Sequence, residues 1–290
     1  MTAFVVRPSF TVPLAHGRML ALGARTLVMG ILNVTPDSFA GSEPDAARAV
    51  ELALRMEAAG ADIIDIGGES TKPGAEPVSE ADELARVMPV IERLAGRLKA
   101  PISIDTYKGG VALAAIQAGA CIVNDISGLG YDPNLGDAVA ETHAGLVLMH
   151  TRGRSKAMYR DASYTDVTAD VAAELHEALG RTAAAGVSAD QVILDPGLGF
   201  AKRAEHSMAL LANLPHFHAL GRPLLVGPSR KSFLSLAMGD RPPADRDWGT
   251  AAAVTAAVML GAHIVRVHDV AAMVDVVRVA DAVRMHVRVD

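Results

Sequence analysis

The chain has 290 residues, of which 50% are hydrophobic and 21% are charged, and its formal net charge is −6. This composition permits a large core and excludes an intrinsically disordered chain. The acidic balance argues against nucleic acid or an anionic membrane surface as a general partner. No apolar run approaches the length of a membrane span. No basic segment followed by an apolar one opens the chain as a signal peptide would. We therefore expect a soluble, cytoplasmic protein.

Short apolar segments alternate with amphipathic segments along most of the chain. The expected strands are 26–33, 62–66, 102–105, 121–125, 146–149, 192–194, 224–226 and 264–267. The expected helices are about 45–59, 79–98, 109–118, 167–185 and 249–260, followed by a last amphipathic helix. This alternation predicts a parallel sheet. Eight such units favour closure into a single (β/α)8 TIM barrel, with an open doubly wound sheet as the alternative.

Residues 1–25 precede the first expected strand. Their apolar residues could form a strand or hairpin that closes the bottom of the barrel. We therefore divide the chain into a short N-terminal extension, 1–25, that packs on the barrel, and one barrel domain, 26–290. The apolar residues of the extension that could form this hairpin are Val12, Leu14, Leu20 and Leu22.

Nearly every expected strand ends in polar, turn-prone residues. The first strand, for example, leads into the segment N-V-T-P-D-S-F at 33–39. The carboxyl ends of parallel strands meet at one mouth of a barrel, so side chains far apart in sequence converge there. We therefore predict an active site at the C-terminal face of the strands. The candidate residues at these ends are Asn33, Asp37, Asp105, Asn124, Asp195, Lys231, Arg266 and His268.

Three of these residues predict a pocket for a flat heterocycle. Asp105, Asn124 and Asp195 end apolar strands, where a carboxylate or amide is costly to bury without a partner. Together they suit a ligand with an amino group beside a ring N–H, and Lys231 would complement its carbonyl or ring nitrogen. Taken singly, Asp105 or Asn124 could equally cap the next helix. The pattern of all the strand ends together favours a binding pocket.

A cationic corner is expected beside this pocket. Arg266 lies in the last expected strand and His268 directly follows it, two residues on, so both face the same side. With Asn33 they would lie near the usual phosphate site of this fold. An anion there gains from the arginine fork and from helix N-termini. Asn33 could ligate a Mg²⁺ ion shared with phosphate oxygens, because this cation takes oxygen ligands.

Other polar residues have simpler explanations. Lys72 and Lys202 lie on expected loops and are interpreted as solvated charges. His150 is interpreted as a satisfied polar residue at the barrel rim, and Ser229 as a helix cap. The single cysteine, Cys121, is interpreted as a small buried hydrophobe.

Seven motifs, each after an expected strand, resemble those of the dihydropteroate synthase family of folate biosynthesis, and they occur in family order. The resemblance covers about 27–270, and seven motifs in order are far more specific than one. The motifs are N-V-T-P-D-S-F (33–39), D-I-G-G-E-S-T-K-P-G-A (65–75), S-I-D-T (103–106), N-D-I-S-G (124–128), D-P-G-L-G-F (195–200), S-R-K-S-F (229–233) and R-V-H-D-V (266–270).

The resemblance implies a transferase that condenses (7,8-dihydropterin-6-yl)methyl diphosphate with 4-aminobenzoate, giving 7,8-dihydropteroate and diphosphate. It implies a pterin site made of Asp105, Asn124, Asp195 and Lys231. It implies a diphosphate site made of Asn33, Arg266 and His268, with Mg²⁺ on Asn33. It implies an aminobenzoate site made of Thr71, Pro73, Phe200 and Ser232. It implies catalytic roles for Asp37, Lys231, Arg266 and His268.

The resemblance also implies an SN1-like path, in which a carboxylate such as that of Asp37 stabilises a methylene cation. A homodimer and inhibition by sulfonamides, as mimics of aminobenzoate, are further expectations. Lys72 departs from the arginine that is common in the family, which removes a bidentate contact from that loop.

Three other interpretations compete with this one. A pterin-dependent methyltransferase would share the Asp/Asn/Asp pocket but would not need T-P-D-S-F, S-R-K-S or R-V-H. A non-catalytic pterin-binding paralogue is disfavoured by the presence of Asp37, Lys231, Arg266 and His268. The third is a barrel whose polar strand ends only cap helices.

Overall fold

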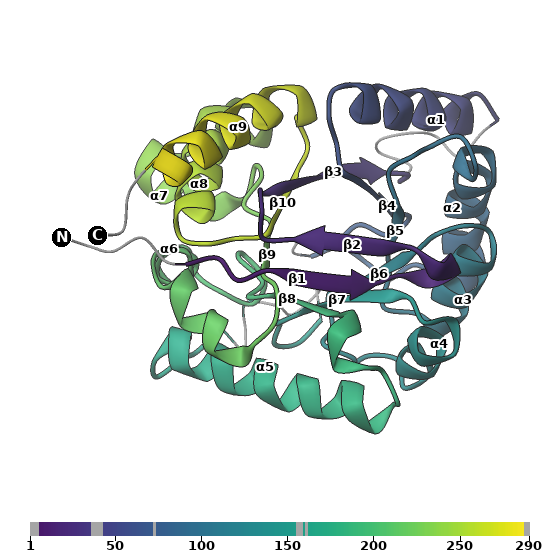
Figure 1. Ribbon diagram of the computed structural model, residues 1–290, viewed down its shortest axis with the longest axis horizontal. Coiled ribbons are helices and arrows are strands. Elements are labelled where there is room, and N and C mark those ends of the chain that lie inside the picture. The colour runs from purple at the N-terminus through teal and green to yellow at the C-terminus, as the bar shows by residue number, and fades with distance from the viewer. Residues whose placement is uncertain (1–5, 36–42, 72–73, 155–158, 160–161, 287–290) are drawn as a thin grey trace.

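The computed structural model describes residues 6–35, 43–71, 74–154, 159 and 162–286 (Figure 1). Helices surround a central barrel of parallel strands. The barrel strands are β3 Leu27–Asn33, β4 Ile63–Gly67, β5 Ile102–Asp105, β6 Ile122–Asp125, β7 Gly145–Met149, β8 Val192–Asp195, β9 Leu225–Val226 and β10 Ile264–Val267. The helices are α1 Glu43–Ala58, α2 Glu80–Leu94, α3 Gly109–Gln117, α4 Asn134–Thr142, α5 Val167–Ala184, α6 Ala204–Ala212, α7 Ser235–Met238, α8 Asp247–Met259 and α9 Val270–His286.

The eight strands close into a ring. They follow the order β8-β7-β6-β5-β4-β3-β10-β9. The gap between the two ends of this order is bridged where Leu194 of β8 pairs in parallel with Leu224, which precedes β9. The N–H of Leu194 also donates to the carbonyl of Pro223 at 2.9 Å. The predicted (β/α)8 barrel is confirmed, and an open sheet is excluded.

The chain order of strands and helices is largely as predicted, with two additions. The helices α4 and α6, nine residues each, were not expected from the sequence. So short a helix gives little more than two turns of periodicity, and Gly136 interrupts the pattern of α4. Ser79 caps the start of α2, because the N–H of Asp82 donates to the Ser79 hydroxyl at 3.1 Å.

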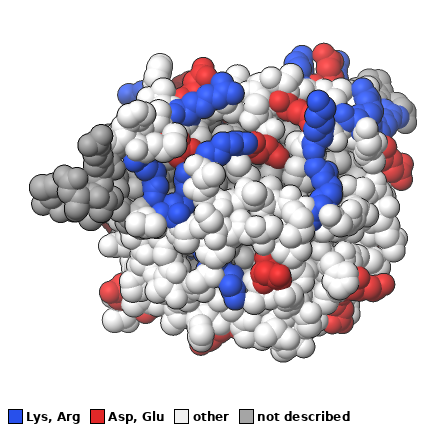
Figure 2. Space-filling model, in the orientation of Figure 1, with Lys and Arg blue, Asp and Glu red and all other residues white. Residues whose placement is uncertain are grey.

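An antiparallel hairpin covers the amino ends of the barrel strands (Figure 1). It consists of β1 Phe10–Pro13 and β2 Met19–Leu22. Val12, Leu14, Leu20 and Leu22 are buried in it and pack against the lower interior of the barrel. These contacts seal the bottom of the barrel with apolar side chains. Figure 2, in the same orientation, shows basic and acidic side chains interspersed on the outer surface of this face.

Strand alternation divides the barrel interior into two layers. Outward residues such as Leu32, Ile64 and Ile104 pack against the helices. The inward residues of the lower half form an apolar plug: Leu27, Met29, Ile63, Ile122, Val147, Ile193, Leu225 and Ile264. The inward positions above the plug are largely polar: Asn33, Asp65, Asp105, Asn124, Asp195 and Arg266. The functional site must lie in this upper layer. Among the described residues, no helix has both the length and the apolar character needed to cross a membrane.

Candidate active site at the barrel mouth

A buried carboxylate lies at the centre of the upper layer. Asp65, in β4, is fully buried. Its Oδ2 accepts hydrogen bonds from Asn124 Nδ2 at 2.9 Å and from Arg266 Nε at 2.6 Å. Arg266 Nη2 donates to Asp105 Oδ2 at 2.6 Å. One guanidinium therefore bridges two carboxylates from neighbouring strands.

The register explains why these side chains meet. Asn33 lies opposite Gly67, Gly67 opposite Asp105, and Asp105 opposite Asn124, so these residues form one row across β3, β4, β5 and β6. Gly67 has no side chain, which leaves room in the row. The row is level with the mouth, while Asp65 lies one inward position deeper.

Burial and the bridging arginine have opposite effects on the acids. Burial raises the pKa of Asp105 to about 7, although Arg266 opposes this and Asp65 adds to it. Burial opposes the charge of Arg266 as well, but Asp65 and Asp105 outweigh it and raise the pKa of the guanidinium. The arginine therefore stays charged, while Asp105 can take up a proton near neutral pH.

A second acid and a lysine lie on the other side of the mouth. Asp195 is buried, and its Oδ1 accepts from the N–H of Gly197 at 2.7 Å. Burial raises its pKa, and Lys231 is the largest opposing influence. Lys231 Nζ donates to the carbonyl of Leu198 and lies 4.5 Å from the centre of the Phe200 ring. Burial lowers the pKa of Lys231 to about 8, with Asp195 opposing the shift.

His268 is held by a serine. Ser229 Oγ lies 2.9 Å from His268 Nδ1 and accepts the backbone N–H of His268 at 3.2 Å. Burial lowers the pKa of His268 to about 4, so its ring is neutral at pH 7. The expectation that Ser229 caps a helix is wrong, because its hydroxyl instead contacts His268, the residue that follows β10.

Arg266 and His268 do not form a corner separate from the acids. The sequence predicts that both residues face an anion together with Asn33. In the structure Arg266 is bound into the acid layer, and Asn33 ends the neighbouring strand β3 with a half-buried side chain. The heterocycle pocket and the cationic corner therefore share the guanidinium of Arg266.

The predicted aminobenzoate residues come from three loops. Thr71 follows β4 and is half-buried, Phe200 follows β8 and is half-buried, and Ser232 is exposed at the start of a 3-10 turn after β9. Pro73 lies outside the described residues, as do Lys72 and Asp37. The structure brings Phe200 next to Lys231 and so joins this predicted site to the pterin residues.

An ion cluster holds the start of the loop after β4. Glu69 accepts from Tyr107 Oη at 2.9 Å and from Lys108 Nζ at 2.5 Å. Lys108 also pairs with Glu83, which is buried on α2. Sequence reasoning did not identify these residues, although Glu69 is part of the G-G-E-S-T segment. The cluster fixes the backbone that leads to Thr71.

Two further residues differ from the sequence-based interpretation. Lys202 is not a solvated charge: it is 2% exposed, and its Nζ lies 2.8 Å from His150 Nδ1. Asp65, at the centre of the site, was not proposed as a site residue. A carboxylate within the apolar run I-I-D-I is a signal that could have identified it. His150 is buried and hydrogen-bonded, as expected. The free thiol of Cys121 is also buried, as expected.

A closed barrel with buried acids, an amide, a lysine and an arginine at its mouth defines a (β/α)8-barrel enzyme with a polar ligand site. The profile of the pterin binding enzyme family matches residues 29–268. A dihydropteroate synthase of Synechocystis sp. is 47% identical over 276 residues, which cover 94% of this chain and 96% of the relative.

Solved structures of dihydropteroate synthases are also similar to this chain. The dihydropteroate synthase of Xanthomonas albilineans, solved with 4-aminobenzoic acid, is 42% identical with a TM-score of 0.87, and the match covers 96% of this chain and 100% of that one. That of Yersinia pestis, in a sulfonamide drug complex, is 42% identical with a TM-score of 0.88, covering 95% and 99%. The chain belongs to the dihydropteroate synthase family, transferases of folate biosynthesis.

Proposed function

We propose that this barrel joins the methylene carbon of (7,8-dihydropterin-6-yl)methyl diphosphate to the amine of 4-aminobenzoate and releases diphosphate. The observation that carries the proposal is the polar upper layer, in which acids and cations alternate above an apolar plug. A flat polar heterocycle can hydrogen-bond there at its edge and rest on apolar side chains below.

The pterin ring is assigned to Asp105, Asn124, Asp195 and Lys231. Carboxylates accept from the amino and ring N–H groups of a pterin, and the ammonium of Lys231 donates to its carbonyl or ring nitrogen. The raised pKa of Asp105, caused first by burial, lets it adjust its proton to the ligand. Asp65 holds Asn124 and Arg266 in place and acts on the substrate only through them.

The diphosphate is assigned to Asn33, Arg266 and His268. Arg266 donates to two carboxylates through Nε and Nη2, so a bound diphosphate would accept from its remaining donors. The neutral ring of His268 is fixed at Nδ1 by Ser229, which leaves Nε2 for a phosphate oxygen.

A Mg²⁺ ion fits these residues only as a companion of the diphosphate. Among the described residues, no group of three or more His, Cys, Asp or Glu side chains could hold a metal ion. Asn33 offers one amide oxygen at the mouth. Magnesium commonly takes one or two protein oxygens and completes its shell with phosphate and water. When bound, it would neutralise charge on the leaving diphosphate.

The aminobenzoate is assigned to the loops that carry Thr71, Pro73, Phe200 and Ser232. One relative is solved with 4-aminobenzoic acid and another with a sulfonamide drug, which supports binding of this class of ligand by the present chain. We infer that sulfonamides compete with aminobenzoate for this chain. Measured inhibition that is uncompetitive with aminobenzoate would contradict this assignment.

The chemistry needs no strong base. The C–O bond between the methylene carbon and the diphosphate breaks, and its electron pair leaves with the diphosphate. The pterin ring delocalises the resulting cation, and Asp37 is proposed to stabilise it. The neutral amine then forms the C–N bond and releases a proton. Loops over the mouth would exclude water, which otherwise competes for the cation.

We further propose a cytoplasmic homodimer. Large apolar side chains are exposed on α7, α8 and α9, with Trp248 86% exposed and Met285 68% exposed. The two longer helices, α8 and α9, pack side by side (Figure 1), so their outer faces adjoin each other. The unpaired, buried thiol of Cys121 suits a reducing compartment. Sedimentation of the purified chain as a monomer at micromolar concentration would contradict the dimer.

The test of the reaction is a coupled assay. The purified chain is incubated with dihydropterin-methyl diphosphate, 4-aminobenzoate and Mg²⁺, and both diphosphate release and dihydropteroate are followed. We expect equal amounts of the two products. Pterin binding without formation of either product would favour a pterin-binding paralogue or methyltransferase instead.

A further inference from the structure

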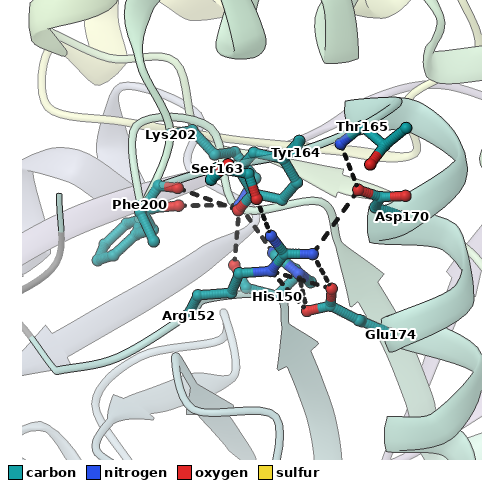
Figure 3. A network of polar contacts seen from close by, with 10 residues as sticks. His150, Arg152, Ser163, Tyr164, Thr165, Asp170, Glu174, Phe200 and Lys202 are labelled. Carbon is teal, nitrogen blue, oxygen red and sulfur yellow. Dashed lines mark hydrogen bonds and ion pairs between the residues drawn. The ribbon is translucent and has the colours of Figure 1, made fainter. Parts of the chain in front are cut away.

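A partly buried polar network, with Lys202 and His150 at its buried end, lies behind the Phe200 loop (Figure 3). Lys202 Nζ is within hydrogen-bond distance of three acceptors: the carbonyl of Phe200 at 2.9 Å, the carbonyl of His150 at 3.3 Å, and His150 Nδ1 at 2.8 Å. His150 Nε2 lies 2.8 Å from Glu174 Oε2 on α5. Arg152 Nε donates to Glu174 Oε1 at 3.0 Å. The network links the end of β7, helix α5 and the loop after β8.

Only one assignment of donors and acceptors is consistent with the pKa values in this network. Partial burial acts to raise the pKa of Glu174, but hydrogen bonds from His150 and Arg152 together outweigh it and lower that pKa to about 2, so this carboxylate only accepts. Burial lowers the pKa of His150 to about 4, so its ring is neutral. Nε2 must then carry the proton, and Nδ1 must accept from Lys202. Each polar group in the chain from Lys202 to Glu174 is satisfied in this arrangement alone.

The network grips the backbone on both sides of one strained residue. Ala201 has a φ of +48°, in the left-handed region that costs a residue with a Cβ atom. The carbonyl before it, of Phe200, accepts from Lys202 Nζ. The carbonyl of Ala201 itself accepts from Tyr164 Oη at 3.0 Å. Strained residues persist where the surroundings over-determine them. These two contacts supply that constraint.

The second contact belongs to the same network. The Arg152 guanidinium lies 4.0 Å from the centre of the Tyr164 ring and also donates to the carbonyl of Ser163. One arginine therefore holds both Glu174 and Tyr164. Gly197 completes the close approach: a Cβ atom there would lie 2.0 Å from the carbonyl oxygen of His150. The loop after β8 is thus held against the end of β7.

We propose that Lys202, His150, Glu174, Arg152 and Tyr164 form a positioning network that fixes the Phe200 ring for 4-aminobenzoate. None of the five touches a substrate in this assignment. They act through the backbone of Phe200, whose ring lies beneath Lys231. The inference rests on the proposed role of Phe200 in the aminobenzoate site.

The test separates the two substrates kinetically. Initial rates are measured for the wild type, Lys202→Met, Glu174→Gln and Tyr164→Phe while each substrate is varied in turn. We expect Lys202→Met to raise the KM for 4-aminobenzoate about tenfold or more, and Tyr164→Phe to raise it about threefold, as expected for lost buried hydrogen bonds. The KM for the pterin diphosphate should stay within about twofold.

The matched control is Thr182→Val on the same helix as Glu174. Thr182 is buried, and its hydroxyl donates to the carbonyl of Leu179, away from the network. This variant should lower the melting temperature without separating the two KM values. Because Tyr164 and Lys202 hold adjacent carbonyls, the double variant Tyr164→Phe/Lys202→Met should raise the KM by less than the product of the single effects.

Equal changes in both KM values, or a change confined to the pterin diphosphate, would overturn the positioning role. So would folded variants with an unchanged KM for aminobenzoate. If Lys202→Met does not fold, Tyr164→Phe carries the test, since it keeps the ring and removes one hydroxyl. Failure of the proposed function is distinct, because the wild type itself would then form no dihydropteroate.

Discussion

The lower and upper halves of the barrel interior are built from the same strands with opposite chemistry. On β8, Ile193 points into the apolar plug, and Asp195, two residues later, points into the charged layer. On β4, Ile63 and Asp65 have the same relation. Burial of the apolar plug stabilises the fold, while each buried charge above it destabilises the fold unless it is paired. Residues of the plug should therefore govern stability, and those of the upper layer should govern binding as well.

The largest stability effect in the upper layer is expected for Arg266→Ala. Removal of the guanidinium leaves the carboxylates of Asp65 and Asp105 without their cation, which costs about 3–5 kcal/mol for a buried pair. It should also weaken diphosphate binding more than aminobenzoate binding. Urea denaturation and product inhibition by diphosphate measure the two effects. The control is Arg278→Ala, whose surface ion pair with Asp275 is worth about 0–1 kcal/mol. A larger loss of affinity for aminobenzoate than for diphosphate would mean that the assignments of the aminobenzoate and diphosphate sites are exchanged.

A truncation in the plug should affect stability alone. Ile122 is fully buried against the hairpin and the neighbouring strands. Ile122→Ala should destabilise the fold by about 2–5 kcal/mol, because it removes packing and leaves a cavity. Both KM values should remain near those of the wild type. A selective rise in the KM for pterin diphosphate would show that the two layers are not independent.

The pH dependence of stability should identify Asp105. Its pKa is raised by burial to about 7 in the folded state, against about 3.9 in the unfolded chain. Between these values the unfolded state has released the proton that the folded state keeps. The contribution of Asp105 to stability is therefore greatest below pH 4 and is lost as the pH rises toward 7, by on the order of a few kcal/mol.

The contributions of the buried histidines to stability change with pH in the opposite direction, so the test needs a reference variant. Burial lowers the pKa of His150, His263 and His268 to about 4, and their contributions are lost as the pH falls from about 6.5 to 4. Asp105→Asn keeps these histidines and removes the carboxylate. The free energy of unfolding of the wild type minus that of the variant, measured by urea denaturation, should be smaller at pH 7.5 than at pH 5. A constant difference would contradict the raised pKa.

The smallest effect is expected from Ser229→Ala. The hydroxyl contacts Nδ1 and the backbone N–H of His268, and a single hydrogen bond is worth about 1 kcal/mol. The KM for pterin diphosphate should rise severalfold, with little change for aminobenzoate. Ser235→Ala, at the start of α7, serves as the control for a general effect of losing a serine. An unchanged KM would mean that His268 does not need this support.

The sequence was sufficient for the barrel and for most of the strand-end residues. Apolar runs that stop in polar residues specify both a parallel strand and its functional end, as at Asp105, Asn124 and Asp195. Residues whose role depends on packing from distant elements were harder to predict. Nothing near Lys202 in the sequence shows that its Nζ lies against His150, 52 residues away. Arg266 was predicted at the mouth, but its partners on β4 and β5 depend on three-dimensional register.

The most direct test of the two-layer interior is a calorimetric titration with dihydropterin-methyl diphosphate of the wild type and of two variants of β8. Asp195→Ala alters the charged layer, and Ile193→Val alters the plug two residues earlier on the same strand. We predict that Asp195→Ala weakens binding at least about a hundredfold, since a buried charged hydrogen-bond acceptor is lost. Ile193→Val should bind as the wild type does and lose only about 0.5–1.5 kcal/mol of stability. Retained affinity in Asp195→Ala, or weakened binding in Ile193→Val, would contradict the assignment of the pterin to the upper layer.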